Sequence, residues 1–422
     1  MDGSSPKISP SPPNSDWGER VGVRGVDGAL PPLTHRRNDP HPPVAGATGP
    51  SLSRPIPGKG RSPLQTRAGE GRKTLRNGAD LAASGVVEAA RIAEIDRVAQ
   101  RYAVAVTPEM IELIDPADPH DPIARQFVPD AAELTTAPEE RSDPIGDARL
   151  SPVKGIVHRY PDRVLLKPLH TCPVYCRFCF RREVVGPGGE VLSDAELSAA
   201  LTYVREHREI WEVILTGGDP LLLSPRRLSE IVAALDAIPH VGVIRLHTRV
   251  PVVSSAHVTA ELVASLRADK AVYVVLHANH PRELTARAVA ACRRIIDSGI
   301  PMLAQSVLLK GVNDDPATFE ALMRGFVRHR IKPYYLHHGD LAPGTSHLRT
   351  SIEDGQHLMR HLRGRVSGLC QPEYVLDIPG GHGKVPIGPT YLGHDQVADW
   401  RGKIHAYPGV PAAAVAKPGT AG

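Results

Sequence analysis

Six short runs of β-branched and apolar residues alternate with stretches of helical spacing through the middle of the chain, and this alternation constrains the fold most. The runs recur roughly every 30 residues, the size of a strand–crossover unit, which predicts parallel strands with right-handed connections. The expected strands are 164–169, 213–217, 243–248, 272–277, 302–309 and 333–338, and the expected helices are 194–207, 226–236, 258–268, 285–298, 316–329 and 353–363. A full barrel has eight units. Six predict an α/β fold, an open partial (β/α)6 TIM-like barrel, with a doubly wound open sheet as the alternative.

Composition divides the rest of the chain. Residues 1–75 are rich in Pro, Gly, Ser and Arg and lack apolar periodicity, so we expect a disordered N-terminal tail that cannot offset its ordering entropy. Residues 76–150 read as an N-terminal helical segment and 151–365 as the barrel. A C-terminal segment, 366–400, carries a lysine in a glycine-rich loop, and 401–422 is expected to be a second tail.

Charge and cysteine usage limit the compartment and the partners. The net charge of +4 is mild and owes much to tail arginines, so a solvated tail is favoured over a nucleic-acid arm. The sequence has no run of 18 apolar residues, so we expect no membrane span. It has no apolar stretch at the N-terminus, so we expect no secretory signal. Of five cysteines, three fall within eight residues. This favours metal binding in a reducing compartment, hence the cytoplasm, over disulfides.

The clustered cysteines stand in "HTCPVYCRFCFRR", directly after the first expected strand. Cys172, Cys176 and Cys179 form C-x3-C-x2-C, at the barrel mouth where chemistry is usually placed. Three thiolates can each bind one iron of a cubane cluster, which leaves the fourth iron open to a chelating small molecule. A zinc site with His158 or His170 as fourth ligand is the alternative, although it lacks a second pair of ligands.

The cysteine spacing, with Phe178 just before the last cysteine, resembles the radical S-adenosylmethionine (SAM) superfamily. The resemblance implies a [4Fe–4S] cluster that binds SAM. Gly217, Gly218 and Asp219 follow the second strand in "LTGGDPLLL". Glycines at a strand end allow close approach of a ligand, and the resemblance implies that this segment meets the methionine moiety of SAM.

Lys384 lies in the glycine-rich segment "DIPGGHGKVPIG". A phosphate-binding P-loop is excluded, because Ile378 and Val385 stand where that motif needs glycine and serine or threonine. A surface lysine is one interpretation. A lysine that forms a Schiff base in a concave site is the other.

Several longer motifs resemble the lysine 2,3-aminomutase family over residues 80 to 395, about the whole expected ordered region. They are "SPVKGIVHRYPDRVLL", "QSVLLKGVND", "PYYLHHGDLAPGTSHLRT" and "DIPGGHGKVPIGP". The resemblance implies an isomerase that moves the α-amino group of L-lysine from C2 to C3 to give β-lysine. It also implies pyridoxal 5′-phosphate (PLP) beside the cluster and SAM, and an external one-electron reductant of the flavodoxin or ferredoxin type.

The resemblance also assigns roles to residues. It implies that Lys384 holds PLP covalently and that Arg181 binds the substrate α-carboxylate. Asp340 and Asp377 are expected to receive the side-chain ammonium of lysine, because a buried carboxylate pair is costly unless a cation lies between its members. The other implied contacts are Arg159, Tyr160 and Arg163 with the PLP phosphate, His337 near PLP, and His277 and Gln305 near the nucleoside of SAM.

The chain departs from clostridial-type members, which bind zinc through C-terminal cysteines and a neighbouring subunit. No cysteine follows Cys370, and Asp315 stands at the position of the partner cysteine. Zinc is therefore not expected, and the oligomeric state stays open, with a homodimer as one option. His337 replaces a tyrosine, as in shorter bacterial enzymes that isomerise lysine for translation elongation factor P. There are three alternatives to the free-lysine aminomutase. The chain could supply β-lysine for elongation factor P, act on another amino acid, or be a non-catalytic metal-binding regulator.

Overall fold

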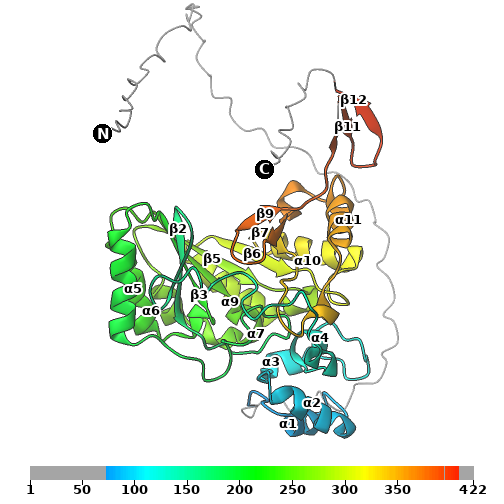
Figure 1. Ribbon diagram of the computed structural model, residues 1–422, viewed down its shortest axis with the longest axis horizontal. Helices are drawn as coiled ribbons and strands as arrows, with labels where there is room; N and C mark the ends of the chain where they lie inside the picture. The colour runs from blue at the N-terminus through cyan, green and yellow to red at the C-terminus, as the bar shows by residue number, and fades with distance from the viewer. Residues whose placement is uncertain (1–72, 394, 408–422) are drawn as a thin grey trace, which may run out of the picture. The chain divides into compact units, whose positions relative to one another are not determined.

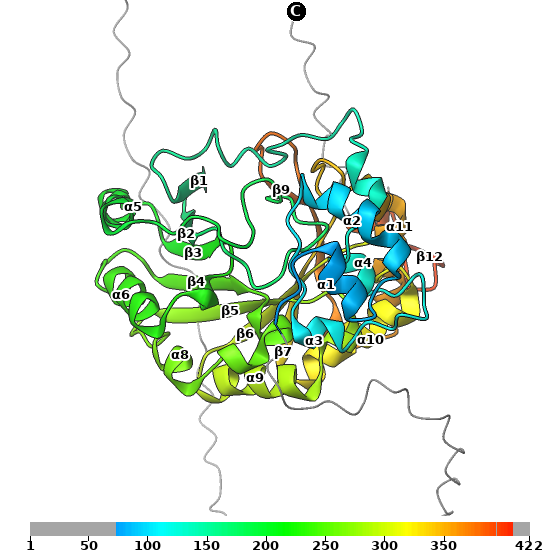
Figure 2. The same ribbon diagram turned by 90° about the horizontal axis from the view of Figure 1, so that it is seen from below.

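A curled sheet of nine strands organises the computed structural model, which describes residues 73–393 and 395–407. The strands lie in chain order, β1 to β9. Within this order the seven strands β2 to β8 are parallel to one another. The short strands β1 and β9 pair antiparallel at the two edges. The sheet does not close, so the predicted open partial barrel is confirmed (Figures 1 and 2). Residues 1–72 of the expected tail lie outside the described residues.

The observed strand bounds agree closely with the expected ones for the six central strands. These are β2 (Arg163–Leu169), β3 (Glu212–Gly217), β4 (Val243–Thr248), β5 (Ala271–His277), β6 (Met302–Val307) and β7 (Ile331–His337). Three strands of this nine-stranded sheet were not expected from the sequence, namely β1 (Ile156–Tyr160), β8 (Glu373–Asp377) and β9 (Lys384–Pro386). They extend the sheet at both edges and carry residues of the site described below.

The crossover helices lie on the outer side of the curved sheet (Figure 2). They are α5 (Asp194–Glu206), α6 (Pro225–Asp236), α9 (Ala286–Asp297), α10 (Pro316–Arg328) and α11 (Ile352–Leu362). Each begins after a serine, threonine or aspartate whose side chain accepts a backbone N–H of the first turn. Such caps stabilise a helix by about 1 kcal/mol.

The third crossover, from β4 to β5, has a shorter helix than predicted. The expected helix 258–268 is reduced to α8 (Ala260–Ala264), with α7 (Val250–Val253) before it. Helix α8 ends with Ser265 as its C-cap, and further along the backbone N–H groups of Asp269 and Lys270 donate to the Asp236 carboxylate. The connection is therefore a pair of short helices.

The remaining described elements lie outside the barrel. Before it come α1 (Gly78–Ala83), α2 (Ile92–Ala99), α3 (Pro108–Ile111) and α4 (Ala124–Phe127), and after it a small sheet of β10 (Leu392–Gly393), β11 (Gln396–Ala398) and β12 (Ile404–Ala406). Across residues 73–393 and 395–407, no helix has the length and apolar character needed to span a membrane. All five cysteines have free thiols.

The main core lies between the strands and these helices. Leu215, Leu246 and Val274 of the sheet and Leu228 and Ile231 of α6 are fully buried. Burial of each such side chain contributes about 1.5–3 kcal/mol. This rigid scaffold fixes the loops at the C-terminal ends of the strands.

Candidate active site

A cavity of about 590 Å³ is lined by residues from all nine strands of the curled sheet. Its volume suits a ligand pocket for small organic molecules. Every site residue predicted from the sequence lines it, from Cys172 on the loop after β2 to Lys384 on β9. Parallel strands bring their C-terminal ends to one edge, which explains why the loops after β2 to β7 share one cavity. The antiparallel edge strands β1 and β9 add Arg159 and Lys384, which are 225 positions apart in the chain.

The three clustered cysteines lie on the loop after β2, and their thiols are half-buried. Burial raises the pKa of all three thiols, that of Cys179 to about 11, and the neighbouring cysteines add to the shift at Cys172 and Cys179. A bound metal reverses this by holding the thiols as thiolates. The three thiols therefore fit an iron–sulphur cluster, in which each thiolate would bind one iron.

The zinc alternative has less support in the geometry. Among the described residues, no three His, Cys, Asp or Glu side chains converge to hold a single metal ion. His158, one of the two proposed fourth ligands, instead hydrogen-bonds through Nδ1 to the Tyr203 hydroxyl at 2.8 Å.

The glycine pair after β3 is packed against backbone. A Cβ on Gly218 would lie 2.2 Å from the Thr171 carbonyl oxygen, and one on Gly217, which has φ +106°, would lie 2.6 Å from the Leu169 carbonyl oxygen. Both glycines therefore let β3 approach the segment that leads into the cysteine loop. This packing against backbone is a role in addition to the expected close approach of a ligand.

Asp219 is buried, and its carboxylate is fully engaged by the protein. It accepts hydrogen bonds from the Thr248 hydroxyl at 2.7 Å and from the backbone N–H groups of Leu221, Arg249 and Val250. Its contact with SAM stays a prediction.

His277 and Gln305 are register partners on β5 and β6 and line the cavity side by side. Burial, with Arg249 nearby, keeps the pKa of His277 well below its usual value, so its imidazole is neutral. Its Nε2 lies 3.2 Å from the Asn279 amide oxygen. The nucleoside contact expected for this pair stays a prediction.

Lys384 lies on the β8–β9 hairpin, far along the chain from the cysteine loop. Its Nζ forms an ion pair with Asp377, its register partner on β8. Its backbone N–H donates to the Tyr160 hydroxyl at 2.7 Å. Gly380, Gly381 and Gly383 of the hairpin loop all have positive φ, a conformation that glycine adopts without strain.

The expected phosphate-binding residues lie beside this lysine on β1 and at the start of β2. The Arg163 guanidinium stacks 4.0 Å from the centre of the Tyr160 ring. Arg159 donates to Asp377 at 3.2 Å and to the Ile145 carbonyl at 2.7 Å, yet its Nε is buried without a hydrogen-bond partner. An unsatisfied buried donor is costly, and an incoming phosphate oxygen would satisfy it. The residues therefore fit PLP.

Asp340 and Asp377 face the same cavity. The Asp340 carboxylate accepts no hydrogen bond and makes no ion pair with any described residue, whereas Asp377 pairs with Arg159 and Lys384. Burial and the neighbouring Asp377 raise the pKa of Asp340 to about 7. The site therefore holds one carboxylate that lacks a cation.

Arg181 is held by a residue that the sequence argument missed. Its Nε donates to Asp147 at 2.8 Å, and Asp147 also pairs with Arg159 at 3.3 Å and Lys167 at 3.6 Å. Burial alone would raise the pKa of Asp147, but the three cations outweigh it and the net shift is downward. The terminal nitrogens of Arg181 donate to no described residue, so they can receive a carboxylate.

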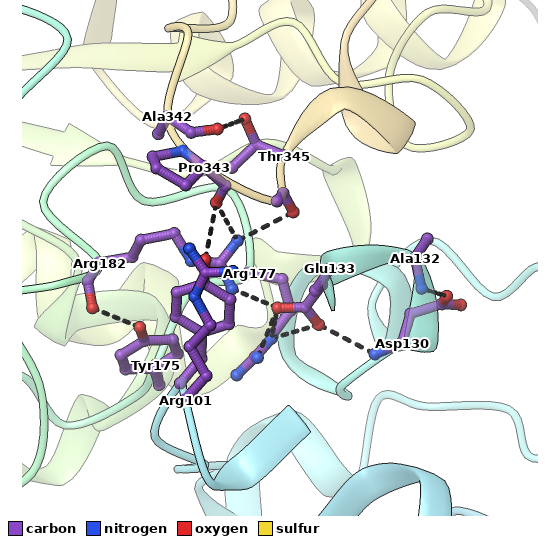
Figure 3. Close-up of polar contacts among 12 residues, drawn as sticks. Arg101, Asp130, Ala132, Glu133, Tyr175, Arg177, Arg182, Ala342, Pro343 and Thr345 are labelled. Carbon is purple, nitrogen blue, oxygen red and sulfur yellow. Dashed lines mark hydrogen bonds and ion pairs between the residues drawn. The ribbon is translucent and has the colours of Figure 1, made fainter. Parts of the chain in front are cut away.

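A buried ion triad fixes the cysteine loop and was also missed. Glu133 accepts bonds from Arg177, at 2.9 and 3.0 Å from Nε, and from Arg182, and all three side chains are at most 1% exposed (Figure 3). Arg177 lies between two of the cysteines, and Arg182 also donates to the Pro343 and Gly344 carbonyls. The triad ties the N-terminal segment, the cysteine loop and the loop after β7 together.

Comparison with known proteins identifies the family. The radical SAM superfamily model matches residues 166–322, and the lysine-2,3-aminomutase model matches residues 359–415. L-lysine 2,3-aminomutase of Clostridium subterminale is 41% identical over 72% of this chain and 74% of its own length. The chain belongs to the lysine 2,3-aminomutase family. It is a radical SAM isomerase whose cofactors are a [4Fe–4S] cluster, SAM and PLP.

Two further relatives and one solved structure resemble the chain. L-lysine 2,3-aminomutase of Acetoanaerobium sticklandii is 41% identical over 71% of this chain and 72% of its own length. Glutamate 2,3-aminomutase of Clostridioides difficile is 37% identical over 76% of this chain and 78% of its own length. A radical SAM methyltransferase structure from Sphaerobacter thermophilus aligns with a TM-score of 0.39 at 20% identity, over 52% of this chain and 68% of that one.

Proposed function

We propose that the chain converts L-lysine to β-lysine by moving the α-amino group from C2 to C3. Overall identity does not separate lysine from glutamate aminomutases, since both kinds of relative lie near 40%. The observation that carries the proposal is the acidic pair of Asp340 and Asp377 in the cavity that also holds the cysteines and Lys384. A substrate side chain with an ammonium would be attracted there, and a carboxylate would be repelled.

The cofactors supply the difficult chemistry. When bound, the cluster and SAM supply a carbon radical that removes a hydrogen atom, and PLP supplies a π-system that delocalises the unpaired electron. The protein's task is to bind and orient these groups and the substrate. Cys172, Cys176 and Cys179 are proposed to hold the cluster, and Gly217, Gly218, Asp219, His277 and Gln305 to surround SAM.

At the other end of the site, Lys384 is proposed to hold PLP through its side-chain nitrogen. Arg159, Arg163 and the Tyr160 hydroxyl are proposed to bind the phosphate, for which the planar guanidinium is well suited. The imidazole of His337 lies 3.9 Å from Asp377. Burial and the adjacent Lys384 hold the pKa of His337 well below its usual value, so it contacts PLP as a neutral group.

The ion pair between Lys384 and Asp377 links cofactor binding to substrate binding. In the ligand-free chain the Lys384 ammonium supplies the positive charge beside the acidic pair. Once that nitrogen holds PLP, it would leave the ion pair with Asp377, and the two carboxylates would then attract another cation. The side-chain ammonium of lysine would supply that cation, while the free terminal nitrogens of Arg181 receive its α-carboxylate.

The partner and the compartment are part of the proposal. A one-electron reductant of the flavodoxin or ferredoxin type is proposed as electron donor. The five free cysteines fit a reducing compartment such as the cytoplasm.

The test is an anaerobic assay of the reduced enzyme, supplied with SAM and PLP, against L-lysine, L-glutamate and L-alanine. We expect β-lysine as the main product and no β-glutamate. Turnover of glutamate in preference to lysine would overturn the substrate assignment while leaving the reaction class intact.

A further inference from the structure

Arg249 is a buried arginine that contacts one of the clustered cysteines. It follows β4 directly, and its Nη1 lies 3.1 Å from the sulphur of Cys176, within hydrogen-bond distance for a sulphur acceptor. The residue is 5% exposed. Among the described residues, no other arginine side chain donates a hydrogen bond to a cysteine sulphur, although the backbone N–H of Arg181 contacts the Cys179 thiol.

The orientation of the Arg249 guanidinium is fixed from two sides. Its Nη2 donates to the Glu283 carboxylate at 2.8 Å and to the Gln126 amide oxygen at 2.6 Å. Glu283 is itself held by the backbone N–H groups of Asn279 and His280. The N–H that meets the sulphur is therefore pre-aimed by two partners that come from distant parts of the chain.

The surroundings of the guanidinium are largely apolar. It lies over the ring of Phe127, 4.6 Å from the ring centre, and 5.3 Å from the centre of the Phe178 ring. Phe178 is the residue just before Cys179. Because Arg249 is 5% exposed, a charge and a hydrogen bond act more strongly here than at the surface.

We propose that Arg249 is a positioning residue that raises the reduction potential of the iron–sulphur cluster by donating a hydrogen bond to the Cys176 sulphur. The inference rests on the proposed ligation of the cluster by Cys172, Cys176 and Cys179. When an external reductant delivers one electron to the cluster, negative charge on the thiolates increases. A fixed cationic donor stabilises that state more than the oxidised one, and hydrogen bonds to cluster sulphurs are known levers on potential. Arg249 itself gains and loses neither electron nor proton.

The test measures the midpoint potential by anaerobic redox titration followed by electron paramagnetic resonance, together with iron and sulphide content. Arg249→Gln removes the charge, and Arg249→Lys keeps the charge but cannot reach both the sulphur and Glu283. Arg245→Gln is the matched control, because Arg245 is a buried arginine on β4, the strand that precedes Arg249, and its carboxylate partner is Glu212. It lies four residues earlier, about 13 Å along an extended strand.

At the wild-type midpoint we expect Arg249→Gln to lower the ratio of reduced to oxidised cluster about tenfold, which is about 59 mV for a one-electron couple. The midpoint potential of Arg249→Lys should lie between those of Arg249→Gln and wild type. This variant supplies the comparison if Arg249→Gln does not assemble a cluster. The control should titrate like wild type.

Two results would overturn the inference. One is an Arg249 variant with full iron and sulphide content and an unchanged midpoint, which would make the residue merely structural. The other is an equal shift in Arg245→Gln, which would make the effect a general one of charge. A wild-type protein without iron and sulphide would instead refute the proposed cluster itself, so the two failures are distinguishable.

Discussion

Asp340→Asn is the substitution that most directly tests the substrate assignment. The amide keeps the size and shape of the side chain but removes its negative charge. Asp340 suits this test better than Asp377, because its carboxylate has no hydrogen-bond or ion-pair partner among the described residues, whereas Asp377 also holds Arg159 and Lys384. Loss of activity in the Asp340 variant therefore reports on the substrate rather than on a disrupted ion pair.

The magnitude follows from the lost charge–charge hydrogen bond. A hydrogen bond between charged groups contributes about 1.5–3 kcal/mol, and the charges attract by about 4 kcal/mol at 4 Å near a protein surface. A loss of about 3 kcal/mol lowers kcat/KM for L-lysine about 10²-fold. Residual turnover should persist, because Asp377 remains.

The pH profile gives an independent readout. Because the folded-state pKa of Asp340 is raised to about 7, the ligand-free site loses its negative charge as pH falls through neutrality. We expect kcat/KM for lysine, which reports on the free enzyme, to fall on the acid side of pH 7 in wild type. This limb should be absent in Asp340→Asn.

The assay compares L-lysine with L-norleucine, which lacks the side-chain ammonium. The substitution should leave the low turnover of norleucine unchanged or raise it. The reasoning is refuted if the variant processes lysine with wild-type kcat/KM, or if its acid limb remains.

Three further predictions concern the attachment of PLP to Lys384, the buried triad around Glu133, and the effect of the Asp340 charge on folding stability. Lys384→Ala should prevent borohydride from fixing PLP to the chain, which mass spectrometry of the treated protein would show; persistent labelling would rule out this lysine. Glu133→Gln should lower the free energy of unfolding in urea by about 3–5 kcal/mol, because it leaves two buried arginines short of a counter-charge; the exposed control Glu139→Gln should cost under about 1 kcal/mol. Asp340→Asn should raise the free energy of unfolding by about 4 kcal/mol at pH 8, because the pKa rises from 3.8 to about 7 on folding and each pKa unit corresponds to about 1.4 kcal/mol. The gain should vanish below about pH 4, and a gain independent of pH would contradict the prediction.

The sequence predicted the central barrel well, and the reason is local. In β2 to β7 the apolar, β-branched runs coincide with buried strands, and the crossover helices begin at polar caps. The placement of Cys172, Gly217 and His277 in one cavity follows, because each lies on a predicted strand or on the loop after it, and the parallel order brings those ends together. Arg159, Asp377 and Lys384 lie on strands that were not predicted.

The unpredicted strands lie at the edges of the sheet. β9 has three residues and ends in Pro386, and β8 has five residues between irregular segments. Such short segments become strands only when a neighbouring strand offers a partner, which local propensity does not encode.

The missed charged residues share a different cause. Glu133 lies 44 residues from Arg177, and Arg249 lies 123 residues from Gln126. A buried ion pair between distant segments leaves no periodic signal, so each of these residues resembles an ordinary surface charge until the fold is known.

The central claim is that three thiols hold a four-iron cluster in the same cavity as a lysine-bound PLP. Iron, acid-labile sulphide and zinc should be measured on protein purified without oxygen, alongside a variant in which Cys172, Cys176 and Cys179 are all alanine. The account predicts about four irons and four sulphides per wild-type chain and neither in the variant. Zinc bound by the wild-type thiols, with no sulphide present, would contradict it.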